Sequence, residues 1–381
     1  MIELLVAADD RTGALETAGA CADAGLAAVV AVVSSSVYET LRCLVVDLGS
    51  RHLQPARAAE LAAAIERRTA GYFAHKIDST LRGNWAYELV ARQRAGNRRI
   101  LVIPAFPAVG RTCVGGLVFE QELRVSHGVA GRDARAPVKS SRPAAHLHTA
   151  GAAATAELAD SEDVRAWLGG EGPAFAVGDA ATDADLERLA TLWHAYPDVL
   201  LAGTAATIGA AATTIAGVGV VPTLARPSLD GPVLVVCGSL HPAARAQIDA
   251  FVTAGALAVS TEEDPGTAVA ALRAGRHVVL ASGRPHTDAV ASSDAVVTSE
   301  RLAAVVAQLA AATRVPTMIL IGGDTAAAVL GDGPVEVGGT VAPGVAWCRP
   351  SGDAGPLVLT KPGGFGGPNA LIDLLAAKMS P

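Results

Sequence analysis

The 381-residue sequence is poor in cysteine, lysine and aromatic residues, and each shortage removes a class of protein. Its five cysteines are scattered without a CxxC pair or a Cys/His ligand spacing, so we expect buried thiols rather than a disulfide framework or a metal site. Only four lysines occur, and the net charge is −7. A chain without a general basic surface is not expected to have nucleic acid as its main partner.

No targeting or membrane segment is predicted. Residues 1–8 have neither a basic n-region nor a long apolar core, which argues against a signal peptide. Residues 199–225 carry no charge and are long enough to suggest a membrane span. Their glycines and threonines favour instead a buried strand at Val199–Ala202 and a buried helix at Ala205–Ala216. We therefore expect a cytoplasmic protein with no membrane partner.

The length suits two domains of roughly 150–220 residues each. Hydrophobic residues make up 51% and charged residues 18%, which favours a compact fold over disorder. Segment Pro222–Pro232 contains three prolines and a glycine and is the predicted boundary, dividing the chain into domains 1–225 and 226–381. Residues 115–155 are less regular, and we expect a hairpin followed by a long excursion there.

Short aliphatic runs alternate with amphipathic Ala/Leu-rich stretches along the whole chain. This order predicts an α/β fold of two domains, each a mostly parallel sheet flanked by helices. The expected strands are Glu3–Ala8, Ala28–Val33, Cys43–Leu48, Tyr72–Lys76, Ile100–Ile103, Ala174–Val177, Val199–Ala202, Val233–Cys237, Ala256–Ser260, His277–Ala281, Thr317–Ile321 and Leu357–Leu359. The expected helices are Thr12–Ala24, Pro55–Thr69, Trp85–Arg94, Asp183–Ala195, Ala205–Ala216, Pro242–Ala254, Glu300–Ala311 and Ala370–Lys378.

Polar residues follow the strands of the first half, where ligands bind in open parallel sheets. They are Asp9 and Asp10 after the first strand, Asp47 and Arg51 after the third, Lys76, Asp78, Ser79 and Arg82 after the fourth, and Arg111 after the fifth. Arginine binds a carboxylate through two hydrogen bonds, and an aspartate can accept a hydroxyl proton, so the set suits a polyhydroxylated anion. Two alternatives remain open: a helix N-cap for one aspartate, and surface ion pairs for the arginines.

Glycines and hydroxyl residues follow the strands of the second half. They are Ser239 after one strand, Gly322, Gly323, Asp324 and Thr325 after another, and Lys361, Gly363, Gly364 and Gly366 after the last. Glycine lets phosphate oxygens approach the backbone, and free N–H groups at a helix start bind anions. A flexible turn is the alternative for the glycines, and a solvated side chain for Lys361. Neither a P-loop motif nor a dinucleotide fingerprint is present.

Nine motifs in order resemble the four-carbon acid sugar kinase family, the ATP-dependent kinases of threonate, erythronate and 3-oxo-tetronate. They are ADDRTGA (8–14), KIDSTLRGN (76–84), PAFPAVGRT (104–112), GDAATDADL (178–186), AGTAATIG (202–209), CGSLHPAARAQI (237–248), IGGDTAAAV (321–329), PGVAW (343–347) and LTKPGGFGGPNAL (359–371). The resemblance runs over nearly the whole chain. It implies a sugar-acid domain at 1–225, an ATP domain at 226–381 and an active site in the cleft between them.

The resemblance also implies roles for the polar residues. Asp9, Asp10, Arg51 and Lys76–Ser79 are similar to the family's substrate contacts, and Ser239, Gly322–Thr325 and Gly363–Gly366 to its ATP contacts. Our hypothesis is that Arg82 or Arg51 holds the carboxylate of the acceptor, with Arg111 nearby, while Asp78 or Asp10 orients or deprotonates its terminal hydroxyl. Mg²⁺ is expected to arrive with ATP and to be held by phosphate and water, without a protein metal site. Lys361 would offset phosphate charge.

This chain departs from the family pattern after Ser239. It has His241 and Ala244 where further hydroxyl residues are usual, so a phosphate or ribose contact is either lost or replaced by the imidazole. Two other functions remain open: an NAD-dependent or aldolase-type enzyme on sugar acids, and a non-catalytic sugar-acid sensor. The stereochemistry of the acid and the oligomeric state, including a homodimer, are not fixed by the sequence.

Overall fold

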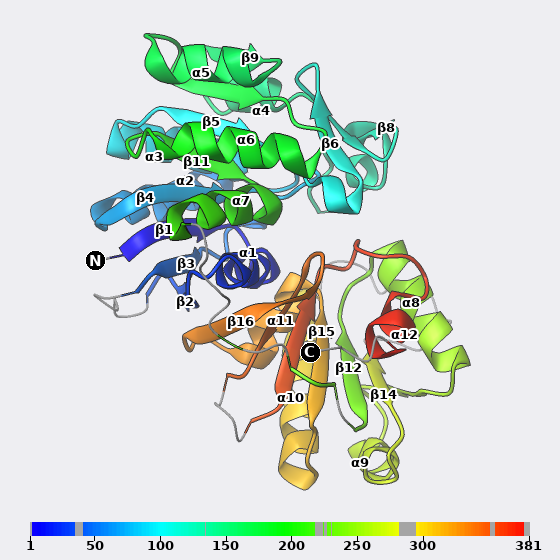
Figure 1. Cartoon of the computed structure of the whole chain (residues 1–381). Coiled ribbons are helices and arrows are strands. Elements are labelled where there is room, and N and C mark those ends of the chain that lie inside the picture. The colour runs from blue at the N-terminus through cyan, green and yellow to red at the C-terminus, as the bar shows by residue number, and fades with distance from the viewer. Residues whose placement is uncertain are drawn as a thin grey trace. The chain divides into compact units, whose positions relative to one another are not determined.

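A computed structural model describes residues 2–34, 41–133, 135–217, 224, 227–229, 231–281, 295–350 and 355–376. The chain forms two compact units, Met1–Thr223 and Leu224–Pro381, which are treated one at a time (Figure 1). Part of the predicted boundary segment Pro222–Pro232 lies outside the described residues, as does the end of the helix expected at Ala370–Lys378.

The first unit contains a parallel sheet whose strand order is β2-β3-β1-β4-β11-β5-β10-β9. These strands are mostly aliphatic and buried on both faces, as is usual for parallel sheets. Their bounds are β1 Ile2–Ala8, β2 Ala28–Val32, β3 Cys43–Asp47, β4 Ala70–Lys76, β5 Ile100–Ile103, β9 Thr155–Leu158, β10 Phe175–Gly178 and β11 Leu200–Gly203.

Helices cover both faces of this sheet (Figure 1). Side chains alternate along a strand, so Ile100 and Val102 belong to one hydrophobic core and Leu101 and Ile103 to another. The helices are α1 Arg11–Asp23, α2 Pro55–Ala64, α3 Trp85–Gly96, α4 Pro143–Thr149, α5 Ser161–Gly169, α6 Asp183–His194 and α7 Ala205–Ala216. Helices α2 and α3 pack together, and α1, α7 and α6 form a second group.

A small antiparallel sheet extends from the end of β5. It consists of β6 Arg111–Val114, β7 Leu117–Glu120 and β8 Leu123–Arg124. A hairpin was expected from residue 115 onward, whereas its first strand already begins at Arg111. Asp179 stabilises the turn by accepting hydrogen bonds from the backbone N–H groups of Gly115 and Gly116 at 2.5 and 2.9 Å.

The second unit has strand order β13-β14-β12-β15-β18-β17-β16. The first five strands are parallel, and β17 and β16 are antiparallel additions at one edge. The strands are β12 Val233–Cys237, β13 Leu257–Ser260, β14 Val278–Ala281, β15 Thr317–Ile321, β16 Val335–Ala342, β17 Val345–Cys348 and β18 Leu357–Lys361. The helices are α8 Pro242–Thr253, α9 Pro265–Arg273, α10 Ala295–Ala312, α11 Gly323–Leu330 and α12 Ala370–Ala376.

The structure confirms the predicted α/β class and its mostly parallel sheets. It adds elements that the sequence patterns did not predict, chiefly α5, α9 and the β16–β17 pair. The uncharged segment that begins at Val199 is confirmed as strand β11 followed by helix α7. Among the residues described, no helix has the length and apolar character needed to cross a bilayer.

Candidate active site

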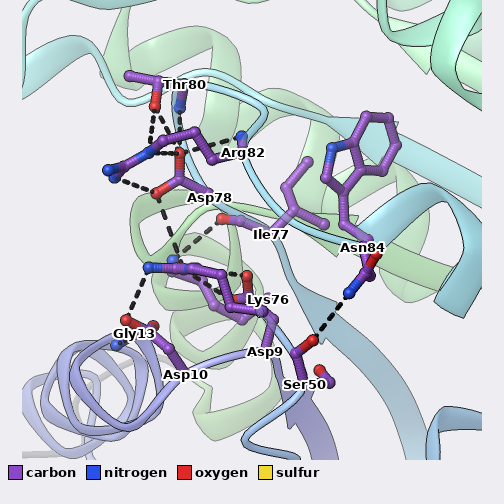
Figure 2. A network of polar contacts seen from close by, with 12 residues as sticks. Asp9, Asp10, Gly13, Ser50, Lys76, Ile77, Asp78, Thr80, Arg82 and Asn84 are labelled. Atoms are coloured by element: carbon purple, nitrogen blue, oxygen red, sulfur yellow. Dashed lines mark hydrogen bonds and ion pairs between the residues drawn. The ribbon is translucent and has the colours of Figure 1, made fainter. Parts of the chain in front are cut away.

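The carboxyl ends of β1, β3 and β4 lie side by side in the first unit. The last residue of β1, Ala8, is in register with Asp47 on one neighbour and with Lys76 on the other. The polar residues that follow these strands are therefore brought to one edge of the sheet, as their positions in the sequence predict. Figure 2 shows the resulting network of polar contacts.

Arg51 is at the centre of this network. Its Nε and Nη2 donate to the two carboxylate oxygens of Asp9 at 2.7 and 2.8 Å, and its Nη1 donates to Asp10 Oδ2 at 2.7 Å. Its Nη2 also lies 3.7 Å from Asp78 Oδ1. Desolvation opposes the charge of Arg51, but the three carboxylates outweigh it and raise the pKa of Arg51 well above its usual value. This arginine remains charged at any physiological pH.

Asp78 and Arg82 form a second pair beside Arg51 (Figure 2). Arg82 Nη2 donates to Asp78 Oδ1 at 2.9 Å, and Arg82 Nε donates to Oδ2 at 3.1 Å. Thr80 donates its hydroxyl to the same Oδ2 at 2.5 Å. The side chain of Arg82 is 30% exposed, compared with 13% for Arg51, so Arg82 is the more accessible of the two guanidinium groups. The alternative of ordinary surface ion pairs does not apply to either arginine.

Helix α1 begins at this edge of the sheet. Asp10 has an extended backbone and accepts the N–H of Gly13 at 2.8 Å, so it is the N-cap of α1. The N-cap alternative is thus correct for Asp10, whose second oxygen binds Arg51 at the same time. A Cβ at Gly13 would lie 2.6 Å from Asp10 Oδ1 and 3.2 Å from Lys76 Nζ, so glycine leaves space for both side chains.

Lys76 lies across α1 and approaches Glu16, one turn beyond Gly13. Lys76 Nζ is 3.8 Å from Glu16 Oε2 and donates to the carbonyl of Ile77 at 3.0 Å. Both side chains are buried, and Glu16 Oε1 has no hydrogen-bond partner among the described residues. Glu16 was not predicted as a site residue. No pattern in the sequence distinguishes it from an ordinary glutamate inside a helix.

The carboxyl groups of this edge differ in acidity. Burial opposes the charged form of Asp78, but Arg82, Arg51 and the hydrogen bond from Thr80 outweigh it and hold its pKa well below the usual range. Burial raises the pKa of Glu16 to about 7 despite the nearby charge of Lys76. Burial likewise raises the pKa of Asp47 to about 6, although Arg11 lies 3.8 Å away. The edge therefore contains both permanently ionised and titrating carboxyl groups.

The pKa of Glu16 predicts a pH-dependent stability. The folded state binds a proton more tightly than the unfolded chain, whose Glu16 keeps the ordinary value of 4.5, so stability falls as the pH rises from 4.5 to about 7. We expect the free energy of unfolding of Glu16→Gln to fall by about 3 kcal/mol less over this pH range than that of the unmodified protein. Urea unfolding at about pH 5 and about pH 8 measures it through tryptophan fluorescence. Three of the four tryptophans, Trp85, Trp167 and Trp193, lie in the first unit.

The control for this prediction is Glu60→Gln, because the side chain of Glu60 is 67% exposed on α2. This variant should follow the pH dependence of the unmodified protein. Stability curves of the Glu16→Gln variant that run parallel to those of the unmodified protein would contradict the assignment.

Arg111 and Ser79 complete the first group of predicted residues. Arg111 is buried; its Nη1 donates to the hydroxyl of Ser79 at 2.7 Å and its Nη2 to Glu120 at 2.6 Å. Glu120 lies on β7, in a region where the sequence was too irregular for residue-level prediction. The structure thus brings together all eight predicted substrate residues: Asp9, Asp10, Arg51, Lys76, Asp78, Ser79, Arg82 and Arg111.

The predicted nucleotide residues also lie together, in the second unit. Strands β12, β15 and β18 are neighbours, and their last residues are in register: Cys237 pairs with Ile321, and Ile321 with Lys361. Gly322 follows β15 with a φ of 106°, a conformation that favours glycine, and precedes helix α11. The hydroxyl of Thr325 accepts the N–H of Gly238 at 3.1 Å, which ties the ends of β15 and β12 together.

The glycine-rich loop after β18 packs against the turn that contains Ser239. A methyl group at Gly363 would overlap the hydroxyl of Ser239, and one at Gly364 would lie 3.1 Å from His241 Nε2. The side-chain amide of Gln247 on α8 donates to the carbonyls of Phe365 and Gly366, both at 2.9 Å. The loop is therefore held in a defined conformation, contrary to the flexible-turn alternative. The glycine backbone of this loop lies beside the starts of helices α8 and α11. Such an arrangement of backbone N–H groups suits the binding of a phosphate chain.

His241 and Ala244 have different roles at this place. His241 is the N-cap of α8 and accepts the N–H of Ala243 at 3.2 Å through Nδ1. Its imidazole lies against Gly364. The imidazole therefore stands beside the glycine-rich loop, where the family usually has a hydroxyl residue. Ala244 is fully buried in the hydrophobic core of this unit.

Lys361, the last residue of β18, is only 2% exposed. The alternative of a solvated loop lysine is therefore wrong. Its Nζ donates to the carbonyl of Pro362 at 3.0 Å, and burial lowers the pKa of Lys361 to about 8. Within the described ranges, no group of three or more His, Cys, Asp or Glu residues could hold a metal ion.

Comparison with known proteins is consistent with this arrangement. Residues 4–212 match the family described as a sugar-binding N-terminal domain, and residues 234–371 match that of a nucleotide-binding C-terminal domain. The chain is 32% identical to a D-threonate kinase of Bordetella bronchiseptica, covering 96% of this chain and 95% of that one. It is 30% identical to a D-threonate kinase of Salmonella typhimurium, covering 98% of both chains.

Solved structures agree in fold. A structure from Salmonella typhimurium LT2 has a TM-score of 0.77 at 20% identity and covers all of both chains. A structure from Bordetella bronchiseptica, a domain-swapped dimer with bound citrate, has a TM-score of 0.50 at 27% identity and covers 99% of this chain and 98% of that one. The two family matches and the 30–32% identity to the D-threonate kinases over nearly the whole chain establish that the chain belongs to the four-carbon acid sugar kinase family.

Proposed function

We propose that this protein transfers the γ-phosphoryl group of ATP to the terminal hydroxyl of a four-carbon sugar acid, with D-threonate as the first candidate. The observation that carries the proposal is the identity to two D-threonate kinases over nearly the whole chain. The grouping of Arg51, Arg82 and three aspartates at one strand edge supports it, because such a set suits a hydroxylated carboxylate.

The first unit is proposed to bind the sugar acid. Arg82 is the better of the two arginines to receive the carboxylate, since its side chain is the more exposed and Asp78 holds its Nε and Nη2, while its Nη1 has a long contact of 3.4 Å to Asp133. Arg51 is the less exposed and already donates three hydrogen bonds to Asp9 and Asp10, and its proposed role is to fix these carboxylates for hydrogen bonds from substrate hydroxyls. Citrate in the related Bordetella bronchiseptica structure supports affinity of this fold for a small carboxylate.

The second unit is proposed to bind ATP. The N–H groups at the start of α11 and the glycines after β18 would hold the phosphates, and Lys361 would offset their charge. ATP supplies the phosphoryl group, and Mg²⁺ neutralises part of its charge. Phosphate oxygens and water are proposed as the main ligands of Mg²⁺, which keeps several waters and binds substrate phosphates in many enzymes.

The chemistry asks the protein mainly for positioning and charge stabilisation. Asp78 or Asp10 is proposed to orient the attacking hydroxyl. The low pKa of Asp78 makes it a weak base, which suits a loose transition state in which the proton leaves late. An active site in the cleft between the two domains, and a homodimeric assembly, stay predictions.

An ADP-release assay over a panel of C4 and C5 sugar acids tests the proposal. We expect release that depends on D-threonate and on both ATP and Mg²⁺. No release with any acid of the panel would contradict the proposal. Titration with NAD separates the dehydrogenase alternative, and binding of an acid without ATP consumption would indicate the sensor.

A further inference from the structure

A buried chain of polar side chains lies beneath the loop that carries Arg51. Ser50, which precedes Arg51, donates its hydroxyl to Glu88 Oε1 at 2.5 Å. The second oxygen of Glu88 is 2.9 Å from His75 Nε2. Ser50, Glu88 and His75 are each 0% exposed. None of them was predicted as a site residue, and none has a part in the function proposed above.

The contact with Arg92 indicates which ring nitrogen of His75 faces Glu88 as a donor. Arg92 Nη1 donates to the carbonyl of Ala74 at 2.7 Å and lies 3.4 Å from His75 Nδ1. An arginine only donates, so Nδ1 of His75 is an acceptor and its proton lies on Nε2. In this tautomer, His75 donates through Nε2 to Glu88. The carboxylate of Glu88 then accepts one hydrogen bond through each oxygen.

This series of hydrogen-bonded side chains ends at the loop that carries Arg51. Asn84 binds the same loop from another side. The side-chain amide of Asn84 donates to the carbonyls of Ser50 and Leu53 at 2.9 and 2.8 Å, and Figure 2 shows the contact to Ser50. The backbone N–H groups of Ser50 and Arg51 donate to the carbonyl of Asp9 at 2.9 and 3.1 Å. The loop is thus tied to β1, to the start of α3 and, through Glu88, to the interior of α3.

Strand β4 connects the two layers. Successive side chains of a strand point to opposite faces, so Lys76 faces α1 and Glu16 while His75 faces α3 and Glu88. A buried ionic group usually stabilises a protein no better than apolar packing of the same volume. The stability of the fold alone therefore does not account for the hydrogen-bonded series Ser50, Glu88 and His75. Its contacts to the loop give it a second role.

We propose that Glu88 and His75, acting through Ser50, are positioning residues that set the position of Arg51 in the acceptor site. This inference rests on the proposed function. Ser50→Ala removes one hydroxyl and leaves Glu88 with an unfilled acceptor. The loop then loses its link to the interior of α3 while the contacts of Asn84 remain, and Arg51 holds Asp9 and Asp10 less accurately.

The test compares KM for D-threonate, KM for ATP, kcat and the melting temperature of Ser50→Ala with those of the unmodified protein. A small misplacement of a binding group can cost up to about 100-fold, so we expect the acceptor KM to rise between about fivefold and about 100-fold. The KM for ATP should stay within about twofold, because the ATP residues lie on the second unit. Glu88→Gln should give a larger rise of the same kind.

Ser141→Ala is the matched control. Ser141 is also a buried serine of the first unit, and its hydroxyl accepts the N–H of Ser126 at 3.0 Å without reaching the Arg51 loop. A purely structural role of Ser50 would lower the melting temperature as in this control and leave the acceptor KM unchanged, which would overturn the inference. Ser50→Ala decides the matter even where Glu88→Gln does not fold. An unmodified protein that phosphorylates no acid of the panel would instead overturn the proposed function, and this inference with it.

Discussion

Asp78→Asn is expected to lower kcat for sugar-acid phosphorylation by at least about 100-fold while the KM for ATP stays within about twofold. Asp78 accepts hydrogen bonds from Arg82 and Thr80 and faces Arg51. An amide in its place has only one acceptor oxygen and turns an NH₂ group towards these donors. Arg82 then loses the partner that orients its fork, and the acceptor loses the group proposed to orient its hydroxyl.

Steady-state kinetics with varied sugar acid and varied ATP separate these effects. Asp160→Asn is the matched control, because Asp160 is the exposed N-cap of α5 and asparagine caps a helix equally well. This control should keep both KM values and kcat. If Asp78→Asn retains the turnover of the control, Asp78 has no place in the active site.

Gly363→Ala should raise the KM for ATP at least about tenfold with little change in the KM for the acid. The added methyl group would overlap the hydroxyl of Ser239 and lie 3.0 Å from its Cβ, so the hydroxyl must rotate away and the loop after β18 or the turn after β12 must shift. Forcing a methyl group into a packed site typically costs 1–3 kcal/mol, and about 1.4 kcal/mol is tenfold in affinity. The displaced backbone is the part proposed to hold the phosphates.

The same loop offers its own control in Gly367→Ala, because a Cβ at Gly367 would meet nothing within 4 Å. Calorimetric titration with ATP measures both variants. Equal affinity of the two for ATP would mean that the contact of Gly363 with Ser239 has no part in nucleotide binding.

The sequence predicted most of the architecture through hydrophobic periodicity. Strands such as Ile100–Ile103, Val233–Cys237 and Thr317–Ile321 were placed correctly to the residue because they are short aliphatic runs buried on both faces. The pair β16 and β17 was missed. Gly338 and Gly339 interrupt β16, and the first of these is explained only by the ring of Trp347, which a side chain at Gly338 would overlap.

The site shows the same limit. Asp9, Asp10, Arg51 and Asp78 could be predicted because parallel strands bring their carboxyl ends to one edge. Glu16 and Glu88 could not, because each lies inside a helix. A helical glutamate is usually a solvated residue, whereas these two are buried beside Lys76 and His75.

By itself, the sequence determined the order of strands and helices, the polar residues at the strand ends and the family, because all three depend on short-range pattern and motif. The tertiary structure alone decided which of these residues pair, which carboxyl groups stay ionised and which buried side chains support them. Those properties depend on burial and on distances of a few ångström between residues far apart in the chain, as between Ser50 and Glu88.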